Sequence, residues 1–64
     1  MKAVVMYDFE GDQDNGELKL VAGEEISIGQ TTIGDGWWEG TDKRGKTGIF
    51  PATYVQVINH GFLA

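Results

Sequence analysis

Ten glycines in a chain of 64 residues constrain the fold more than any other feature of this sequence. They interrupt nearly every stretch longer than about ten residues, and a glycine in a helix interior costs roughly 1 kcal/mol relative to alanine. Apolar residues do not repeat at helical spacing but alternate with polar ones, as they do in strands with one buried face. The sequence therefore predicts short strands joined by turns, with almost no helix.

The alternation can be followed along the chain. It predicts strands over residues 2–7, 25–28, 37–41, 46–50 and 55–58. Pro51 ends the fourth strand, because proline cannot donate to a sheet ladder, and residues 52–54 fit one tight helical turn. Residues 8–17 and 29–36 are polar and contain glycine, so we expect loops there, and residues 42–45 read as a hairpin turn. Five short strands at this spacing predict an all-β fold, a small antiparallel barrel or sandwich.

Strand parity also predicts the core. The expected buried side chains are Ala3, Val5, Leu18, Leu20, Ile26, Ile28, Phe50 and Val55. Gly40 should face the same interior, where a side chain would collide with a neighbour. We expect one domain over residues 1–58 and a tail over residues 59–64, with docking of Phe62 or Leu63 on the domain as the alternative.

Composition excludes several classes of function. The chain has no cysteine and one histidine, so disulfides, thiol chemistry and Cys- or His-rich metal sites are excluded, and no cofactor is expected. No motif supplies a positioned nucleophile or base, so we do not expect an enzyme. Ten acids against five bases give a net charge of −5, which disfavours nucleic acid and anionic membranes as partners. No apolar run approaches the roughly 20 residues of a membrane span. We expect a soluble, cytoplasmic and monomeric domain without membrane insertion.

The charge is unevenly distributed. Residues 8–17 hold five acids and no base, and Tyr7 and Phe9 lie at the start of this run. Acids beside aromatic faces attract a cation both by charge and through the ring quadrupoles. Residues 42–46 carry a net charge of +2, from three bases and one acid, and we interpret them as a solvated hairpin tip. Contact with anionic lipid is the alternative for that tip.

Five large aromatic residues remain outside the predicted core, namely Tyr7, Phe9, Trp37, Trp38 and Tyr54. A barrel this small cannot bury them all and still close. Together with Pro51 they suggest a binding strip for a proline-rich peptide, whose polyproline II helix is preformed and loses little entropy on binding. Peripheral packing is the alternative. Trp38 points to the opposite side of its strand from Trp37, so we expect it to pack at the barrel margin, with a secondary contact as the alternative.

The chain resembles the Src-homology-3 (SH3) family in five segments that follow the family's order and spacing. They are VMYDF at 5–9, ELKL at 17–20, GEEI at 23–26, GWWEG at 36–40 and GIFPATYV at 48–55. They are similar, in turn, to the ALYDY motif, the acidic-Leu segment, the diverging turn, the paired-tryptophan strand and the G-[apolar]-[apolar]-P-x-x-Y-V signature. The sequence also looks like the SH3 domains of sorting-nexin-type proteins, which implies an adaptor in signalling or endocytosis.

The resemblance implies a five-stranded barrel with a 3-10 turn before its last strand, and a non-catalytic module for PxxP segments that carry Arg or Lys. The positions that match the family's two Xaa-Pro pockets are Tyr7, Phe9, Trp37, Pro51 and Tyr54. Glu17 matches the acid that pairs with the ligand's basic residue, and Asp14 and Asp35 are expected to add charge nearby. Thr53 stands where the family often has an Asn that donates to the ligand backbone.

Two other binding functions remain open at this point. The same aromatic strip suits a folded protein partner, such as ubiquitin or another domain. A small barrel that binds nucleic acid also exposes aromatics for stacking, but it needs a basic groove, and the aromatics here lie beside acids.

Overall fold

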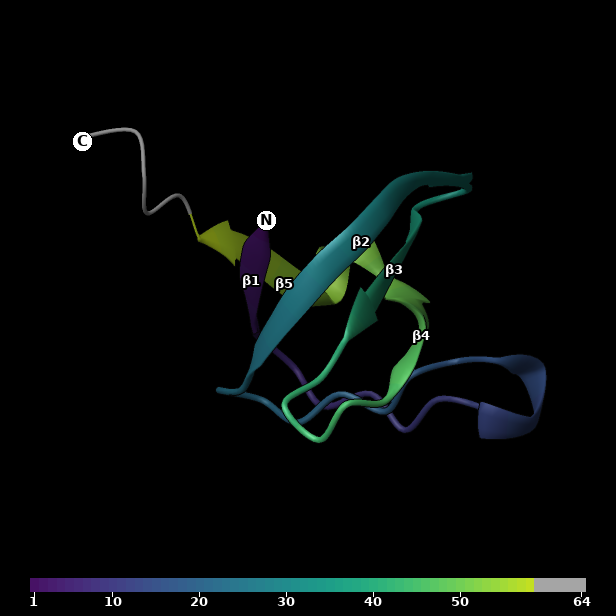
Figure 1. The fold of residues 1–64 in the computed structure, drawn as a ribbon, viewed down its shortest axis with the longest axis horizontal. Coiled ribbons are helices and arrows are strands. Elements are labelled where there is room, and N and C mark those ends of the chain that lie inside the picture. The colour runs from purple at the N-terminus through teal and green to yellow at the C-terminus, as the bar shows by residue number, and fades with distance from the viewer. Residues whose placement is uncertain (59–64) are drawn as a thin grey trace.

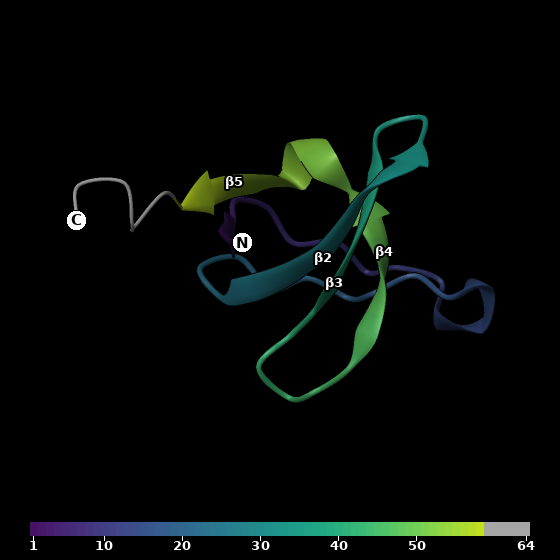
Figure 2. The ribbon, with the colours of Figure 1, turned by 45° about the horizontal axis from the view of Figure 1, so that its top comes forward.

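Five antiparallel strands form one sheet in the order β4-β3-β2-β1-β5 in the computed structural model, which describes residues 1–58 (Figure 1). The strands are β1 (Lys2–Val5), β2 (Glu25–Gly34), β3 (Trp37–Thr41), β4 (Thr47–Pro51) and β5 (Val55–Ile58). Two 3-10 helices complete the fold, η1 (Gln13–Asn15) and η2 (Ala52–Tyr54). Figure 2 shows the strongly twisted β2 at the centre, with β3 and β4 on one side and β5 on the other. The all-β prediction and the turn before the last strand are confirmed, and the predicted tail at 59–64 lies outside the described residues.

The long segment that joins β1 to β2, residues 6–24, is here called the RT loop, and it folds back on itself. The backbones of Phe9 and Leu20 pair, with N···O distances of 3.1 and 2.8 Å. Its tip is the helix η1, which the sequence analysis did not predict. Asp12 caps η1 by accepting from the N–H of Asp14 at 3.2 Å, and η1 ends at Gly16, whose φ of 81° is left-handed. The loop therefore has two arms, residues 7–12 and 17–22, joined by a fixed tip.

The prediction of a loop over residues 29–36 was wrong for most of that range, because β2 continues to Gly34. Its pairing with β3 passes through two register shifts, one on each side of Gln30, and ends with Gly34 opposite Trp37. Glycine marks these irregularities, but it does not stop a strand whose partner continues to pair. The turn itself lies where predicted, and Gly34, Asp35 and Gly36 have φ values of 110°, 56° and 79°.

The core agrees closely with the prediction from parity. The hydrophobic residues that are no more than 9% exposed are Ala3, Val5, Leu18, Leu20, Ile26, Phe50 and Val55. Ile28 is only partly buried and packs against this cluster, so its predicted full burial was wrong. Gly40 faces the interior as expected, because a Cβ there would lie 2.7 Å from the Cγ2 of Ile26 and 2.7 Å from the carbonyl oxygen of Ser27.

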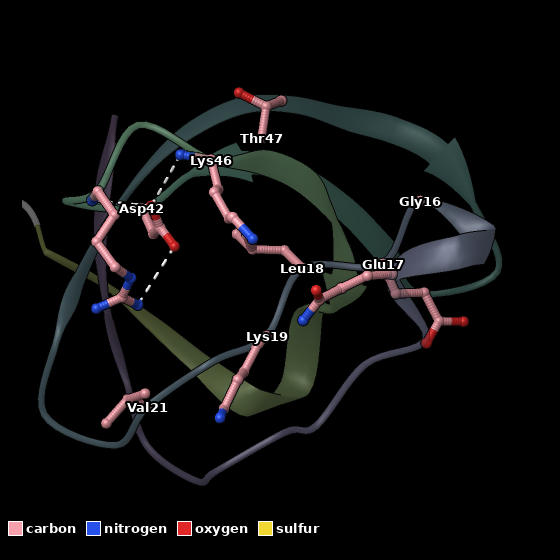
Figure 3. Close-up of a pocket in the computed structure, with 10 residues that line it drawn as sticks. Gly16, Glu17, Leu18, Lys19, Val21, Asp42, Lys46 and Thr47 are labelled. Carbon is pink, nitrogen blue, oxygen red and sulfur yellow. Dashed lines mark hydrogen bonds and ion pairs between the residues drawn. The ribbon is translucent and has the colours of Figure 1, made fainter.

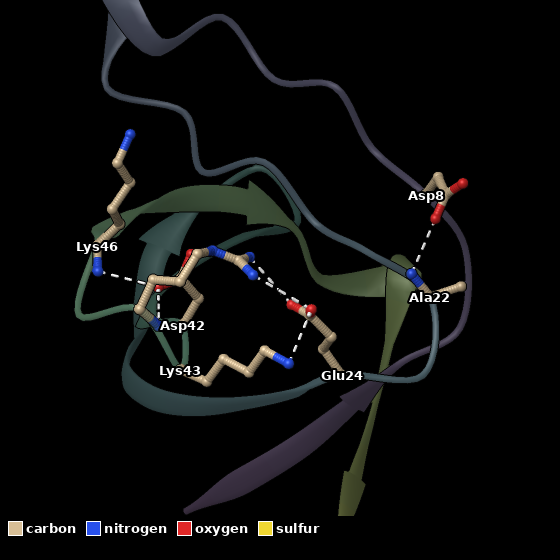
Figure 4. Close-up of polar contacts among 7 residues, drawn as sticks. Asp8, Ala22, Glu24, Asp42, Lys43 and Lys46 are labelled. Carbon is tan, nitrogen blue, oxygen red and sulfur yellow. Dashed lines mark hydrogen bonds and ion pairs between the residues drawn. The ribbon is translucent and has the colours of Figure 1, made fainter.

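Charged contacts tie the β3–β4 hairpin to the turn before β2 (Figure 4). The Arg44 guanidinium donates to both carboxylate oxygens of Glu24, at 3.2 and 3.0 Å, and Lys43 Nζ lies 3.4 Å from the same carboxylate. The hydrogen bond from Arg44 holds the pKa of Glu24 below its ordinary value. These two bases remain exposed, as predicted for a solvated tip, and they also pair with Glu24.

Asp42 organises the hairpin turn from within. Its side chain is 3% exposed, and its Oδ1 accepts from the backbone N–H groups of Arg44 and Lys46, each at 2.9 Å. Burial acts to raise the pKa of Asp42, but the backbone hydrogen bonds from Lys46 and Arg44 outweigh it, so the pKa lies below its ordinary value. Gly45 adopts the left-handed φ of 87° that the sequence predicted for this turn.

Candidate functional site

Four aromatic rings form a continuous strip on the surface. Phe9 lies at its centre, with its ring centroid 6.1 Å from that of Trp37 and 5.6 Å from that of Tyr54. Tyr7 extends the strip, 5.8 Å from Tyr54. All three contacts are edge-to-face, the arrangement that ring quadrupoles favour, and each such pair is worth about 0.5–1.5 kcal/mol beyond area burial. We call these four rings and the adjacent Pro51 the aromatic strip.

These rings are held in place by segments that are far apart in the sequence. Tyr7 and Phe9 come from the first arm of the RT loop. Trp37 begins β3 and lies opposite Pro51, the last residue of β4. Pro51 leads directly into η2, which ends at Tyr54, and the carbonyl of Tyr54 accepts from the N–H of Met6 at 2.8 Å. Backbone pairing therefore fixes the strip before any ligand arrives.

The residues of the strip differ in their exposure to solvent. Tyr7 is 59% exposed, whereas Phe9, Trp37, Pro51 and Tyr54 are partly buried. Trp38 points the other way and packs against the core beside Phe50, its partner in β4, which confirms the packing prediction for Trp38. Four of the five aromatics outside the predicted core therefore lie together, and Trp38 does not join them. The assignment of the strip residues to two Xaa-Pro pockets stays a prediction.

The predicted acids lie on three different segments of the fold. Glu17 begins the second arm of the RT loop and Asp14 lies in η1, while Asp35 occupies the turn between β2 and β3. Thr53 is exposed in η2. Glu17 Oε1 already accepts from the N–H of Asp12 at 2.8 Å. The pairing of these residues with a ligand stays a prediction.

The acidic run has a structural role that the sequence analysis missed. Asp8 Oδ1 accepts from the N–H of Ala22 at 2.8 Å, which joins the two arms at the base of the loop (Figure 4). Asp12 Oδ2 accepts from the side-chain amide of Asn15 at 2.7 Å, in addition to capping η1. Asp is a common N-cap residue of helical turns. Asp12, followed by a glycine at position 16, could therefore have predicted the short helix η1 between them.

A hollow of about 510 Å³ lies beside the second arm of the RT loop rather than at the strip (Figure 3). Of the residues predicted to bind peptide, only Glu17 lines it. Within residues 1–58 no group of acids and histidine is placed to hold a metal ion, and no helix there is long and apolar enough to cross a membrane.

Residues 5–56 match the family of variant SH3 domains. The chain belongs to the SH3 family. This SH3 domain is 38% identical over 58 residues to sorting nexin-33 of Xenopus tropicalis, a match that covers 91% of the chain and 10% of that protein. The chain thus spans about a tenth of the length of this relative. An SH3 domain is a non-catalytic, peptide-binding interaction module.

Solved structures agree with the family assignment. The SH3 domain of yeast Pin3 superposes with a TM-score of 0.81 at 32% identity, and the match covers 92% of this chain and all of that one. An SH3 domain from a 40.4 kDa protein of S. cerevisiae, solved with a peptide, has a TM-score of 0.76 at 38% identity, over 89% of this chain and 93% of that one. The fold predicted from the sequence resemblance is therefore confirmed.

Proposed function

We propose that this SH3 domain binds a proline-rich PxxP segment in the polyproline II conformation, with Arg or Lys near one end of the segment. The observation that supports this most is the aromatic strip, in which four rings and Pro51 present adjoining apolar faces. A polyproline II helix has three residues per turn and no internal hydrogen bonds, so successive Xaa-Pro units meet successive gaps between the rings. Because both partners are already ordered, little conformational entropy is lost on binding.

We propose that acids beside the strip select the basic residue. Glu17 has one oxygen bound to the loop backbone, which fixes the carboxylate and leaves Oε2 to accept from a ligand. An arginine guanidinium pairs with a carboxylate through a planar fork and stacks on indole, so a pocket with Glu17 on one side and Trp37 on the other suits it. Asp14 and Asp35 contribute longer-range attraction.

The experiment that tests peptide binding is an NMR titration of the labelled domain with two PxxP peptides, one with Arg before the motif and one with Arg after it. We expect shifts at the Trp37 indole, at Tyr7 and Tyr54, and along the acidic part of the RT loop, and the stronger peptide gives the orientation. Trp37→Ala should abolish binding. Ile33→Ala is the matched control, because Ile33 is also apolar and 42% exposed but lies outside the strip. If neither peptide shifts these signals, the proposal is wrong and a folded partner is the next candidate for the strip.

The role of the acids has a separate test. Glu17→Gln combined with Asp14→Asn should weaken binding of the Arg peptides most at low salt, because exposed charge pairs are screened at high salt. Glutamine keeps an acceptor for the N–H of Asp12, so the loop should stay intact. Equal affinities of wild type and double variant across the salt series would remove the electrostatic part of the proposal.

We further propose that the domain serves a cytoplasmic adaptor of the endocytic type. The similarity to sorting nexin-33 supports this proposal. Imaging of the tagged natural protein in cells tests it, and a location outside the cytoplasm would contradict it.

A further inference from the structure

The hollow beside the second arm of the RT loop combines basic side chains with an apolar floor. It is lined by Gln13, Gly16, Glu17, Leu18, Lys19, Val21, Asp42, Arg44, Lys46 and Thr47. Its volume of about 510 Å³ lies within the roughly 300–1,000 Å³ of typical small-ligand sites. Apart from Glu17 it shares no residue with the predicted peptide contacts, so one loop borders the aromatic strip with its first arm and this hollow with its second. We call it the second-arm groove.

Some of the charged side chains of the second-arm groove are already paired within the domain, and others are not. Asp42 accepts from two N–H groups of the hairpin backbone, and Glu17 uses one oxygen to accept from the N–H of Asp12 and keeps the other for a ligand of the aromatic strip. Arg44 is held by Glu24 and Asp42, at 3.0 and 3.3 Å. Lys19 and Lys46 form no ion pair with any residue in the described part of the chain. Two lysines are therefore the positive charges of the groove that have no ion-pair partner in the described residues.

The two free lysines stand on different sides of the groove. Figure 3 shows the Lys46 side chain reaching from the β3–β4 hairpin toward Leu18, while Lys19 points to the rim near Val21. Leu18 is buried and Val21 is partly buried, and both contribute apolar atoms to the lining of the groove. This surface is net positive in a chain whose net charge is −5. The charge of the groove is thus opposite to that of the molecule as a whole and to that of the acidic RT loop.

We propose that the second-arm groove binds a short acidic peptide segment in which carboxylates flank an apolar residue. The carboxylates would pair with Lys19 and Lys46, and the apolar side chain would rest on Leu18 and Val21. A membrane surface fits less well, because two lysines provide only weak attraction to anionic lipid and the net negative charge of the domain opposes it. The groove is also concave, whereas a bilayer surface is flat on this scale.

The test uses a capped peptide with Leu flanked on each side by two Glu, and a matched peptide with Gln in place of every Glu. In an NMR titration of the labelled domain, the Glu peptide should shift the amides of Lys19, Val21, Lys46 and Thr47, and the Gln peptide should not. The Trp37 indole should stay unchanged. Absence of these shifts with the Glu peptide at millimolar concentration overturns the proposal.

Variants separate a local site from general charge attraction. Lys46→Gln should lower the affinity for the Glu peptide about threefold, as expected for the loss of one partly exposed ion pair. The double variant Lys19→Gln, Lys46→Gln should lower it about tenfold. Lys43→Gln removes the same charge from the same hairpin but does not line the groove, so it is the matched control. An equal loss with Lys43→Gln overturns the proposal. Cosedimentation with vesicles gives the second control. The proposal is overturned in favour of anionic lipid if the domain binds vesicles of phosphatidylcholine and phosphatidylserine more strongly than vesicles of phosphatidylcholine alone, and if Lys46→Gln abolishes this difference.

Discussion

Gly40→Ala is the substitution for which the structure gives the sharpest expectation. A Cβ at Gly40 would lie 2.7 Å from the Cγ2 of Ile26, 2.7 Å from the carbonyl oxygen of Ser27 and 3.1 Å from Cε2 of Phe50. The side chains of Ile26 and Phe50 are buried, and the oxygen of Ser27 belongs to the paired strand β2, so none of these atoms can move freely. The added methyl must therefore push β2 and β3 apart.

The cost of that displacement follows from the behaviour of overpacked cores. Inserting a methyl group into a well-packed core costs about 1–3 kcal/mol, and a backbone contact at 2.7 Å places Gly40→Ala in the upper part of this range. A domain of this size has a total unfolding free energy of only about 3–10 kcal/mol. We therefore expect a loss of about 2–3 kcal/mol, which lowers Tm by about 10–20 °C.

Urea denaturation followed by tryptophan fluorescence measures this loss, and Gly29→Ala is the matched control. A Cβ at Gly29 meets only the carbonyl oxygen of Glu39, at an ordinary 3.7 Å. Alanine there should be neutral or raise the unfolding free energy by about 0.4–1 kcal/mol, since glycine loses more chain entropy on folding. The reasoning would be refuted if Gly40→Ala changed the unfolding free energy by less than about 0.5 kcal/mol, which is the usual effect of a surface substitution. Equal losses of unfolding free energy in both variants would also refute it.

Three further predictions concern charge, the strip and the RT loop. Because the pKa values of Glu24 and Asp42 are lowered on folding, the stability they contribute is complete above their ordinary values of 4.5 and 3.8 and is lost as the pH falls below them. Glu24→Gln should therefore flatten the pH dependence of urea unfolding between pH 6 and pH 3, and an unchanged profile would contradict this. Tyr7→Ala should lower the unfolding free energy by about 1 kcal/mol or less, because the ring is 59% exposed, but should weaken the PxxP peptide about tenfold or more by calorimetry. Gly48→Ala should destabilise the domain about as much as Gly40→Ala, because its Cβ would meet an RT-loop carbonyl oxygen at 2.8 Å, and unchanged Tm would contradict this.

Much of this fold could be predicted from the sequence because each strand has one buried face. Alternation alone placed Leu18 and Leu20 inside and Lys19 outside, although residues 17–20 form no regular strand and only Glu17 and Leu20 make isolated bridges. The length of β2 could not be predicted in this way. Its outer half, up to Gly34, is exposed on both faces and is defined by pairing with β3, a non-local interaction that leaves no period in the sequence.

The site shows a similar division. The strip was predictable because five large aromatics exceed what the core can hold, so some had to be exposed. The edge-to-face order of Tyr7, Tyr54, Phe9 and Trp37 was not, since it depends on how the RT loop packs against the start of β3 and the turn after β4. The use of Asp8 as a clamp between the arms was also hidden, because a carboxylate that binds backbone N–H groups has the same sequence signature as a free one.

The adjacency of β1 and β5 has a mechanical consequence. Lys2 pairs with Ile58 and Val5 with Val55, so the two ends of the described chain leave the sheet side by side. A pulling force applied through those ends would peel β5 from β1 one pair at a time, instead of loading all the hydrogen bonds together as in a shearing geometry. Peeling reaches Tyr54, whose carbonyl binds Met6, directly after Val55. Tension along a chain that carries this domain should therefore dismantle the aromatic strip at low force, before the β2–β3–β4 sheet yields.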